Sequence, residues 1–276
     1  MSTNSHHFSL SLSLSQVGDL VGGHLPFTTY QLVNPAKAPF GLWDLTQYLT
    51  ADNINLGVGL YGMPGSTAYG GLIDVLAPLA NETIFISAAS GAVGSLVGLL
   101  AKKLYNCTVI GSAGGPAKCK VLMELGYFDH AIDYKTHETA ESLTAALKEA
   151  APDGIDMYFE NVGGIHFDAA FASLRTKGRI AVCGSISNYN TAPGAQVGNV
   201  VNISAMIYTQ QRIQGFLCGD YLSGKKLKFF EDIDKLFKAG EIQLPEDTVF
   251  TGIEQWPAGF ASLFTGKKMG KVVVQV

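Results

Sequence analysis

The sequence has few charged residues and no excess of basic ones. Aspartate, glutamate, lysine and arginine make up 15% of its 276 residues, whereas about 25% is typical of soluble domains. Its 19 basic and 23 acidic side chains give a net charge of −4, so it lacks the positive surplus that binding a nucleic-acid backbone requires. The scarcity of charge predicts extensive buried surface, part of which we expect to be shared with a second copy in a homodimer.

Cysteine is scarce as well, and no C-x-x-C pair or cysteine–histidine cluster occurs. The four cysteines are Cys107, Cys119, Cys183 and Cys218. A chain of this length needs no disulfide framework, and these spacings do not suit a structural zinc site. His24, His130 and His166 likewise lack the spacing of metal ligands. We therefore expect reduced thiols, a cytoplasmic location and no bound metal.

Long hydrophobic runs are absent. No stretch reaches the roughly 18 consecutive apolar residues of a membrane-spanning helix, so we expect no membrane partner. Residues 1–15 contain no Lys or Arg and no continuous apolar core, which a signal peptide requires. Serine and leucine alternate from Ser9 to Ser15. This two-residue period predicts either a strand with one apolar face or a disordered leader over residues 1–15.

From residue 58 onward, short β-branched stretches alternate with helical patterns. The expected strands are 83–87, 108–111, 131–133, 155–159, 178–183, 212–217 and 271–276. One expected helix follows the glycine-rich turn and continues through residues 102–103. The others cover 116–125, 139–150, 165–174 and 224–239, and Gly126 is expected to terminate the helix over 116–125. Strands that alternate with helices at this spacing predict the α/β class with a doubly wound parallel sheet.

A glycine-rich turn after the first of these strands is the strongest local signal. Residues 87–94 read S-A-A-S-G-A-V-G, a variant of the dinucleotide fingerprint in which Ala88 replaces the first glycine. Gly91 allows the backbone to approach a pyrophosphate, and Gly94 allows the helix to pack against the strand. Free amides and the positive end of the helix dipole attract phosphate. A tight turn without a ligand is the alternative at this point.

The end of the second strand decides which dinucleotide is expected. Proteins that bind NAD place an acid there to accept a hydrogen bond from the ribose 2′-hydroxyl, and residues 109–115 contain none. Lys118 follows on the next helix, and Tyr134 ends the third strand. A missing carboxylate removes repulsion from a 2′-phosphate and a nearby lysine adds attraction, so NADP(H) is favoured over NAD(H).

Six stretches occur in the order typical of one protein family: residues 62–69, 87–94, 158–164, 178–184, 186–190 and 212–216. Together they resemble the medium-chain dehydrogenase/reductase superfamily, in particular its zinc-free branch of prostaglandin reductases, leukotriene B4 dehydrogenases and plant 2-alkenal (double-bond) reductases. The resemblance implies a Rossmann NADP(H) domain over 63–244. It also implies a GroES-like β lobe for substrate, here incomplete, built from 16–62 and 245–276.

The resemblance also implies roles for individual residues. It places the cofactor against Gly91, Ala92, Val93, Gly94, Lys118, Tyr134, Asn161, Cys183, Gly184, Ser187, Tyr189, Phe216, Leu217 and Cys218. Tyr208 matches the tyrosine assigned to orient the substrate carbonyl or protonate the product, although an aromatic residue beside an apolar strand is also typical of core packing. Near the C-terminus, Lys268 stands where the family usually has an asparagine that touches the cofactor, so that role is not carried over.

The implied activity is hydride transfer from NADPH to the C=C bond of an α,β-unsaturated aldehyde or ketone. A phenol near the carbonyl oxygen would stabilise the enolate that forms. Two alternatives stay open: a non-catalytic NADP(H)-binding protein, and a quinone reductase. The family has a further segment ahead of residue 17 that builds much of the substrate lobe. An alternative gene product, a natural variant with poor turnover, or a partner that completes the cleft would each account for this difference.

Overall fold

The computed structural model describes residues 16–25, 30–38, 41–191, 203–222, 228–266 and 268–276. The chain divides into two compact units, which we call the N-terminal unit (residues up to 67, with 217–241) and the sheet unit (68–216, with 242–276). The predicted domains, 63–244 and 16–62 with 245–276, stay predictions. The GroES-like lobe itself stays a prediction. The serine–leucine alternation over Ser9–Ser15 lies outside the described residues.

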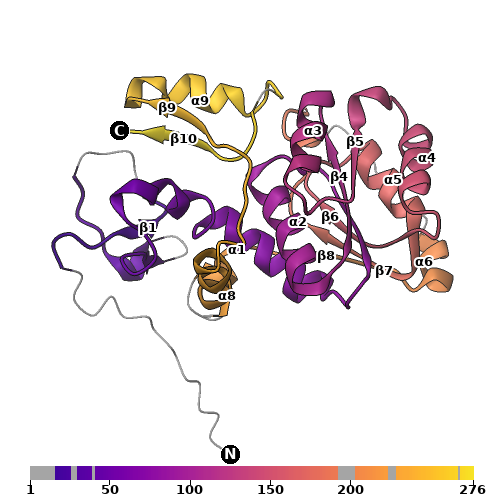
Figure 1. Cartoon of the computed structure of the whole chain (residues 1–276), viewed down its shortest axis with the longest axis horizontal. Helices are drawn as coiled ribbons and strands as arrows, with labels where there is room; N and C mark the ends of the chain where they lie inside the picture. Colours follow the sequence, from indigo (N-terminus) through magenta and orange to yellow (C-terminus); the bar gives the residue numbers. More distant parts are fainter. Residues whose placement is uncertain (1–15, 26–29, 39–40, 192–202, 223–227, 267) are drawn as a thin grey trace, which may run out of the picture. The chain divides into compact units, whose positions relative to one another are not determined.

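Six strands form the parallel sheet of the sheet unit (Figure 1). In spatial order they are β5 (His130–Asp133), β4 (Thr108–Ala113), β3 (Thr83–Ile86), β6 (Ile155–Glu160), β7 (Leu174–Val182) and β8 (Arg212–Gly215). Every neighbouring pair runs parallel. The strand order reverses between β3 and β6, the point at whose carboxyl edge ligands bind in such sheets. The predicted doubly wound parallel sheet is confirmed.

Helices cover both faces of this sheet. They are α2 (Ala92–Tyr105), α3 (Pro116–Glu124), α4 (Ala140–Ala150), α5 (Ile165–Ser173) and α6 (Ile203–Thr209). The bounds of α2, α3, α4 and α5 agree closely with helices expected from the sequence, because apolar periodicity and turn residues mark them. The sequence did not predict α6. Gly126 follows α3 with φ +74° and its N–H bonds the carbonyl of Met123, as expected of a glycine that terminates a helix.

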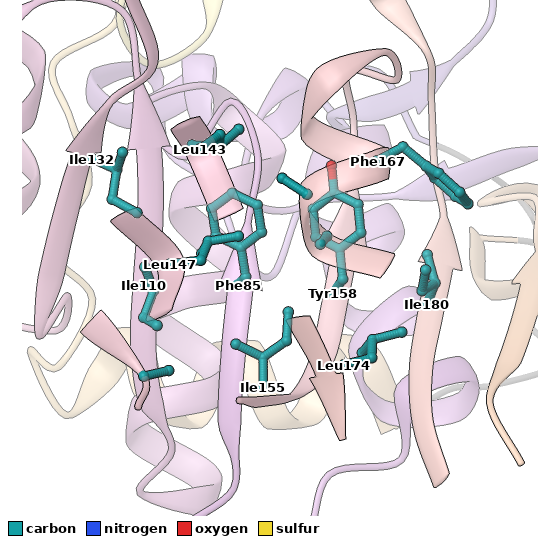
Figure 2. Packing of buried hydrophobic residues seen from close by; sticks show 13 residues of the cluster. Phe85, Ile110, Ile132, Leu143, Leu147, Ile155, Tyr158, Phe167, Leu174 and Ile180 are labelled. Carbon is teal, nitrogen blue, oxygen red and sulfur yellow. The ribbon is translucent and has the colours of Figure 1, made fainter. Parts of the chain in front are cut away.

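The apolar core under α4 and α5 is shown in Figure 2. Leu143 and Leu147 of α4 pack against strand residues that include Phe85 and Tyr158, whose rings stack with centroids 5.1 Å apart. These side chains are almost fully buried, so each contributes about 1.5–3 kcal/mol relative to an exposed position. This packing fixes the register of β3 and β6, and therefore the position of the loops that follow them.

On the opposite face of the sheet, α2 and β4 both pack against the ring of Phe128. A Cβ added at Gly98 of α2 or at Gly111 of β4 would lie 2.5 Å and 2.8 Å, respectively, from the ring of Phe128. Both positions therefore need glycine to admit the phenyl ring. The close packing holds the start of α2 near the end of β3.

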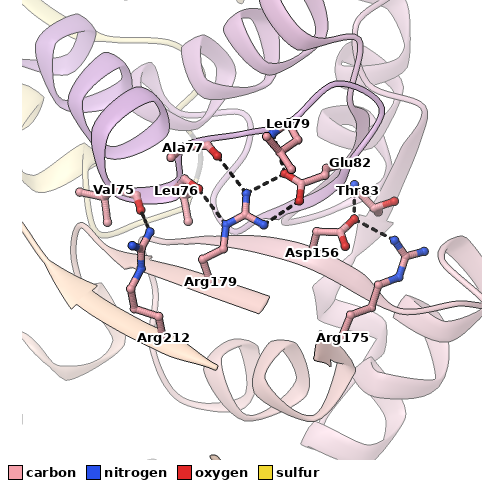
Figure 3. Close-up of polar contacts among 10 residues, drawn as sticks. All are labelled: Val75, Leu76, Ala77, Leu79, Glu82, Thr83, Asp156, Arg175, Arg179 and Arg212. Atoms are coloured by element: carbon pink, nitrogen blue, oxygen red, sulfur yellow. Dashed lines mark hydrogen bonds and ion pairs between the residues drawn. The ribbon is translucent and has the colours of Figure 1, made fainter. Parts of the chain in front are cut away.

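Two arginines bind a π-helix at the amino edge of the sheet (Figure 3). This π-helix, η3 (Gly70–Leu76), ends in carbonyls that its own turns leave unpaired. Arg179 Nε donates to the carbonyl of Leu76 at 2.8 Å, and Arg212 donates to that of Val75. The guanidinium of Arg179 also forms two hydrogen bonds to the carboxylate of Glu82, at 2.7 and 2.6 Å.

The remaining elements are short. The described residues of the N-terminal unit contain an antiparallel pair, two 3-10 helices, of which the first is η1 (Pro35–Lys37), and two further helices. Those of the C-terminal part of the sheet unit contain a parallel pair, the 3-10 helix η6 (Ile253–Gln255) and α9. They are β1 (Val21–Gly23), β2 (Leu42–Asp44), η2 (Ala51–Val58), α7 (Gly219–Leu222), α8 (Lys228–Lys238), β9 (Thr248–Thr251), α9 (Trp256–Ser262) and β10 (Val272–Gln275), while α1 (Met63–Tyr69) spans the boundary between the units. None of the described helices is long and apolar enough to cross a membrane.

Candidate nucleotide-binding site

The turn between β3 and α2 adopts the geometry of a phosphate-binding loop. Ala88 has φ +49°, the left-handed conformation that glycine adopts freely and that costs an L-residue about 1 kcal/mol. A Cβ added at Gly94 would lie 2.6 Å from the carbonyl oxygen of Ala88, so only glycine lets α2 begin this close to the turn. Gly91 precedes the helix and has no side chain to cap it. The first-turn amides therefore face the position where an anion would bind.

Tyr134 and the helix that carries Lys118 both border the end of β4. The hydroxyl of Tyr134 lies against Gly114, where an added Cβ would be 2.9 Å away. Lys118 is on the first turn of α3 and is half-buried. Burial, followed by the nearby charge of Lys135, lowers the pKa of Lys118. An anion would relieve both effects.

An acid that the sequence analysis did not single out shapes the same loop. Asp133 Oδ1 accepts the N–H of Gly115 at 2.7 Å and that of Lys135 at 3.1 Å. Its carboxylate thus ties the end of β4 to the end of β5. Only its position at the end of the third expected strand could have indicated this, because Gly115 and Asp133 are distant in sequence.

The C-terminal segment runs beside the phosphate-binding turn. Gly270 donates its N–H to the carbonyl of Ser90 at 3.0 Å and forms a parallel bridge with Gly91. Two residues earlier, Lys268 is half-buried. Burial, then the charges of Lys118 and Lys271, lower its pKa. Lys268, whose role the sequence left open, is thus close enough to Lys118 for that charge to lower its pKa.

A buried hydrogen-bond network joins the ends of β3 and β6. Glu160, only 1% exposed, accepts hydrogen bonds on Oε1 from the Tyr158 hydroxyl at 2.9 Å, from the Gly163 N–H at 2.9 Å and from the Val162 N–H. Ser87 Oγ accepts the N–H of Asn161 at 2.9 Å, and the Asn161 amide donates to the Ser87 carbonyl at 2.8 Å. These contacts hold Asn161 at the switch point of the sheet.

The loop after β7 is fixed to the same network. Cys183 and Gly184 donate their N–H groups to the carbonyl of Glu160 at 3.0 and 3.1 Å. Ser187 donates its hydroxyl to the carbonyl of Val162 at 2.6 Å. The hydroxyl of Tyr189 lies 2.9 Å from the position of a Cβ added at Gly184. These predicted site residues therefore gather along the carboxyl edge of the sheet.

The remaining predicted site residues lie on α6 and directly after β8. Phe216 follows β8 and contacts Phe159 edge-on, with centroids 6.1 Å apart. Leu217 and Cys218 belong to the N-terminal unit. Tyr208 is 82% exposed on α6, which leads into the amino end of β8, the edge of the sheet away from the fingerprint turn. Among the described residues, no hydrogen bond links Tyr208 to another predicted site residue.

We expect stability to depend on pH through Glu160. Burial raises the pKa of this carboxyl, and the hydrogen bonds it accepts offset the rise only in part. A raised folded-state pKa stabilises the fold below the unfolded value of 4.5 and loses that contribution as the pH rises through the folded-state value. Wild type should therefore lose stability relative to Glu160→Gln between about pH 5 and about pH 8, measured by thermal unfolding.

The matched control for this prediction is Glu149→Gln, which changes the same charge at an exposed position on α4. Its stability should follow that of wild type at both pH values. A constant difference between wild type and Glu160→Gln across the pH range would show that Glu160 is not a destabilising buried charge.

The residues present suit a phosphorylated dinucleotide. The turn leaves a cradle that a Cβ at Gly94 would fill. Lys118 after β4 and Lys268 in the C-terminal segment are half-buried and form no ion pair with a carboxylate among the described residues. Within the same residues, no group of three or more His, Cys, Asp or Glu side chains is placed to hold a metal ion.

Comparison with known proteins gives consistent matches. Residues 92–237 match the family model described as zinc-binding dehydrogenase. The chain is 42% identical over 261 residues to a 2-alkenal reductase (NADP(+)-dependent) from Nicotiana tabacum, covering 95% of this chain and 72% of the relative. It is 39% identical to prostaglandin reductase 1 from Bos taurus, covering 94% and 75%.

A solved structure supports the same relationship. The structure of CurA from Vibrio vulnificus in complex with NADPH has a TM-score of 0.73 and 36% identity, with 82% of this chain and 66% of that chain covered. The chain therefore spans about two thirds to three quarters of the length of these relatives.

Proposed function

The chain belongs to the zinc-binding dehydrogenase family, among its 2-alkenal and prostaglandin reductases, and we propose that it reduces the C=C bond of α,β-unsaturated aldehydes and ketones with NADPH. The observation that carries this proposal is the glycine turn before α2, in which a Cβ at Gly94 would lie 2.6 Å from the carbonyl oxygen of Ala88. Lys118 on the first turn of α3 and Tyr134 beside Gly114 add support for a 2′-phosphate. When bound, NADPH supplies the hydride that adds to the β-carbon of the conjugated carbonyl.

The chain's own residues bind and orient the reactants. First-turn amides of α2 hold the pyrophosphate, and Lys118 with Tyr134 holds the 2′-phosphate. The Glu160 network keeps the loop after β6 in place beside the fingerprint turn, so that Asn161 presents a fixed surface to the nicotinamide side. Conjugation already makes the β-carbon electrophilic, so we propose that the reaction proceeds without a metal.

Tyr208 is proposed as the donor to the substrate carbonyl oxygen. Its phenol would stabilise the negative charge that develops on this oxygen as the hydride adds. We further propose that residues 16–62 and 245–276 contribute the substrate lobe. A cytoplasmic homodimer is proposed from the low charge and scattered cysteines, with β8 as the exposed edge strand that a second copy would extend.

Turnover of a medium-chain 2-alkenal, followed by the loss of NADPH absorbance, tests this function. Tyr208→Phe should lower the rate by about tenfold to a hundredfold and leave NADPH affinity unchanged, since one charge-stabilising donor is removed. Tyr105→Phe, at the end of α2 opposite the fingerprint turn, is the matched control and should behave as wild type. An unchanged rate for Tyr208→Phe would show that its proposed role is wrong.

Two further outcomes would identify the alternatives. Tight NADPH binding with no turnover of a 2-alkenal or a small quinone would indicate a non-catalytic nucleotide-binding protein. Faster turnover of the quinone than of the 2-alkenal would indicate a quinone reductase.

A further inference from the structure

Lys268 is held beside the phosphate-binding turn by the backbone that follows it. Gly270 donates its N–H to the carbonyl of Ser90 at 3.0 Å and bridges to Gly91. Gly270 has φ +56°, and a Cβ there would lie 2.6 Å from the carbonyl of Glu246. This crowded contact leaves the C-terminal segment little freedom. Lys268, two residues away, is therefore fixed near the site.

Lys118 and Lys268 are two half-buried cations, and Lys118 is close enough to disfavour the charge of Lys268. Besides burial, Lys118 is among the causes that lower the pKa of Lys268. Neither lysine forms an ion pair with a described residue. The two nearby carboxylates have other contacts: Asp133 accepts two backbone N–H groups, and Asp247 accepts the N–H of Lys271 at 2.9 Å. Two like charges without an anion destabilise a fold, and such an arrangement is typical of a binding site.

We propose that Lys268 and Lys118 together form a two-cation site for the 2′-phosphate of the dinucleotide. This inference rests on the proposed function, because it takes an NADP(H) phosphate as the anion. Ammonium groups act as point charges on a phosphate and make charge-assisted hydrogen bonds to its oxygens. Lys118 reaches the phosphate from the start of α3 and Lys268 from the C-terminal segment. A neutral side chain at position 268 would leave Lys118 as the only cation of this pair.

Titration calorimetry with NADPH and NADH tests the proposal on wild type, Lys268→Gln and Lys118→Gln. Lys268→Gln should weaken NADPH binding by about tenfold to a hundredfold, because one charge-assisted contact is lost. NADH lacks the 2′-phosphate, so its affinity should change by less than about threefold. Lys120→Gln is the matched control, because it removes a lysine charge at an exposed position of α3, the helix that carries Lys118. It should leave the affinities for NADPH and NADH unchanged.

A fold control accompanies the titration. Removing one of two like charges should not lower stability, so Lys268→Gln without nucleotide should unfold at the same temperature as wild type or higher. An equal loss of NADPH and NADH affinity would overturn the proposal, because Lys268 would then contact the shared pyrophosphate. An unchanged NADPH affinity would also overturn it.

Failure of the proposed function has a different signature. Wild type would then show no preference for NADPH over NADH, or would bind neither. If wild type prefers NADPH and only Lys118→Gln removes this preference, the proposed cofactor stands and the role of Lys268 is wrong.

Discussion

Replacement of Arg179 by methionine is expected to lower the free energy of unfolding by about 3 to 5 kcal/mol, the loss typical of breaking a buried ion pair. The side chains of Arg179 and Glu82 are each 16% exposed and form two hydrogen bonds to each other (Figure 3). Methionine would leave the carboxylate of Glu82 buried without its counter-ion. It would also remove the donor to the carbonyl of Leu76 at the end of η3. Urea unfolding at neutral pH measures this loss.

Arg175→Met is the matched control for this substitution. Arg175 forms one ion pair, with Asp156 at 2.8 Å, and its side chain is 37% exposed. Asp156 is 15% exposed but keeps the N–H of Thr83 as a donor, so we expect a loss of about 1 to 2 kcal/mol. A loss of that size at Arg179 would contradict the view that its ion pair is buried and supports η3.

The pH dependence of the same pair has a definite sign. Burial raises the pKa of Glu82, but hydrogen bonds from Arg179 and from the Leu79 N–H outweigh it and hold the pKa below its usual value. Stability from this carboxylate is therefore present above the unfolded value of 4.5 and is lost as the pH falls through the folded-state value. Arg179→Met should lose less of its stability than wild type when the pH falls through this range.

Local patterns in the sequence predicted the six strands of the parallel sheet, the helices α2 to α5 and the fingerprint turn. A β-branched run such as 83–86 between turn residues specifies a buried strand by itself, and a glycine turn before an apolar helix specifies the phosphate loop. Both signals are contained within about one helical turn or one strand. The structure therefore reproduces them with small shifts at their ends.

Contacts between distant segments could not be read in this way. The hydrogen bond from Gly270 to Ser90 and the network between Ser87 and Glu160 depend on the register of strands far apart in the chain. The π-helix η3 was not predicted either. Its last carbonyls accept hydrogen bonds from Arg179 of β7 and Arg212 of β8, which are distant in the sequence. Such features arise from tertiary packing, which overrides local propensity.

Tyr208 shows the limit of an argument from family resemblance. The resemblance assigns a residue type to a position in the chain, whereas distance from the cofactor site depends on how α6 is packed. The structure gives Tyr208 an exposed side chain at the start of the connection to β8. Its proposed role as a proton or hydrogen-bond donor therefore depends on kinetics, and the phenylalanine variant tests it directly.

Gly94→Ala is expected to weaken NADPH binding by about a hundredfold or more, because displacing a binding loop by about 1 Å has effects of this size. The added methyl would lie 2.6 Å from the carbonyl oxygen of Ala88 and 2.8 Å from Ala89 Cα. Both are backbone atoms, so the clash can be relieved only by moving the turn away from α2. The first-turn amides would then no longer converge on the pyrophosphate.

Gly98→Ala separates this effect from a general loss of stability. It adds the same methyl to the same helix, but the clash, at 2.5 Å, is with the side-chain ring of Phe128 and not with the backbone of the turn. Both variants should lose about 1 to 3 kcal/mol of stability through overpacking. Only Gly94→Ala should also lose NADPH affinity, measured by calorimetry below the unfolding temperature of either variant. Equal losses of affinity would mean that the turn binds no phosphate of its own and that α2 contributes to binding only through the stability of the sheet.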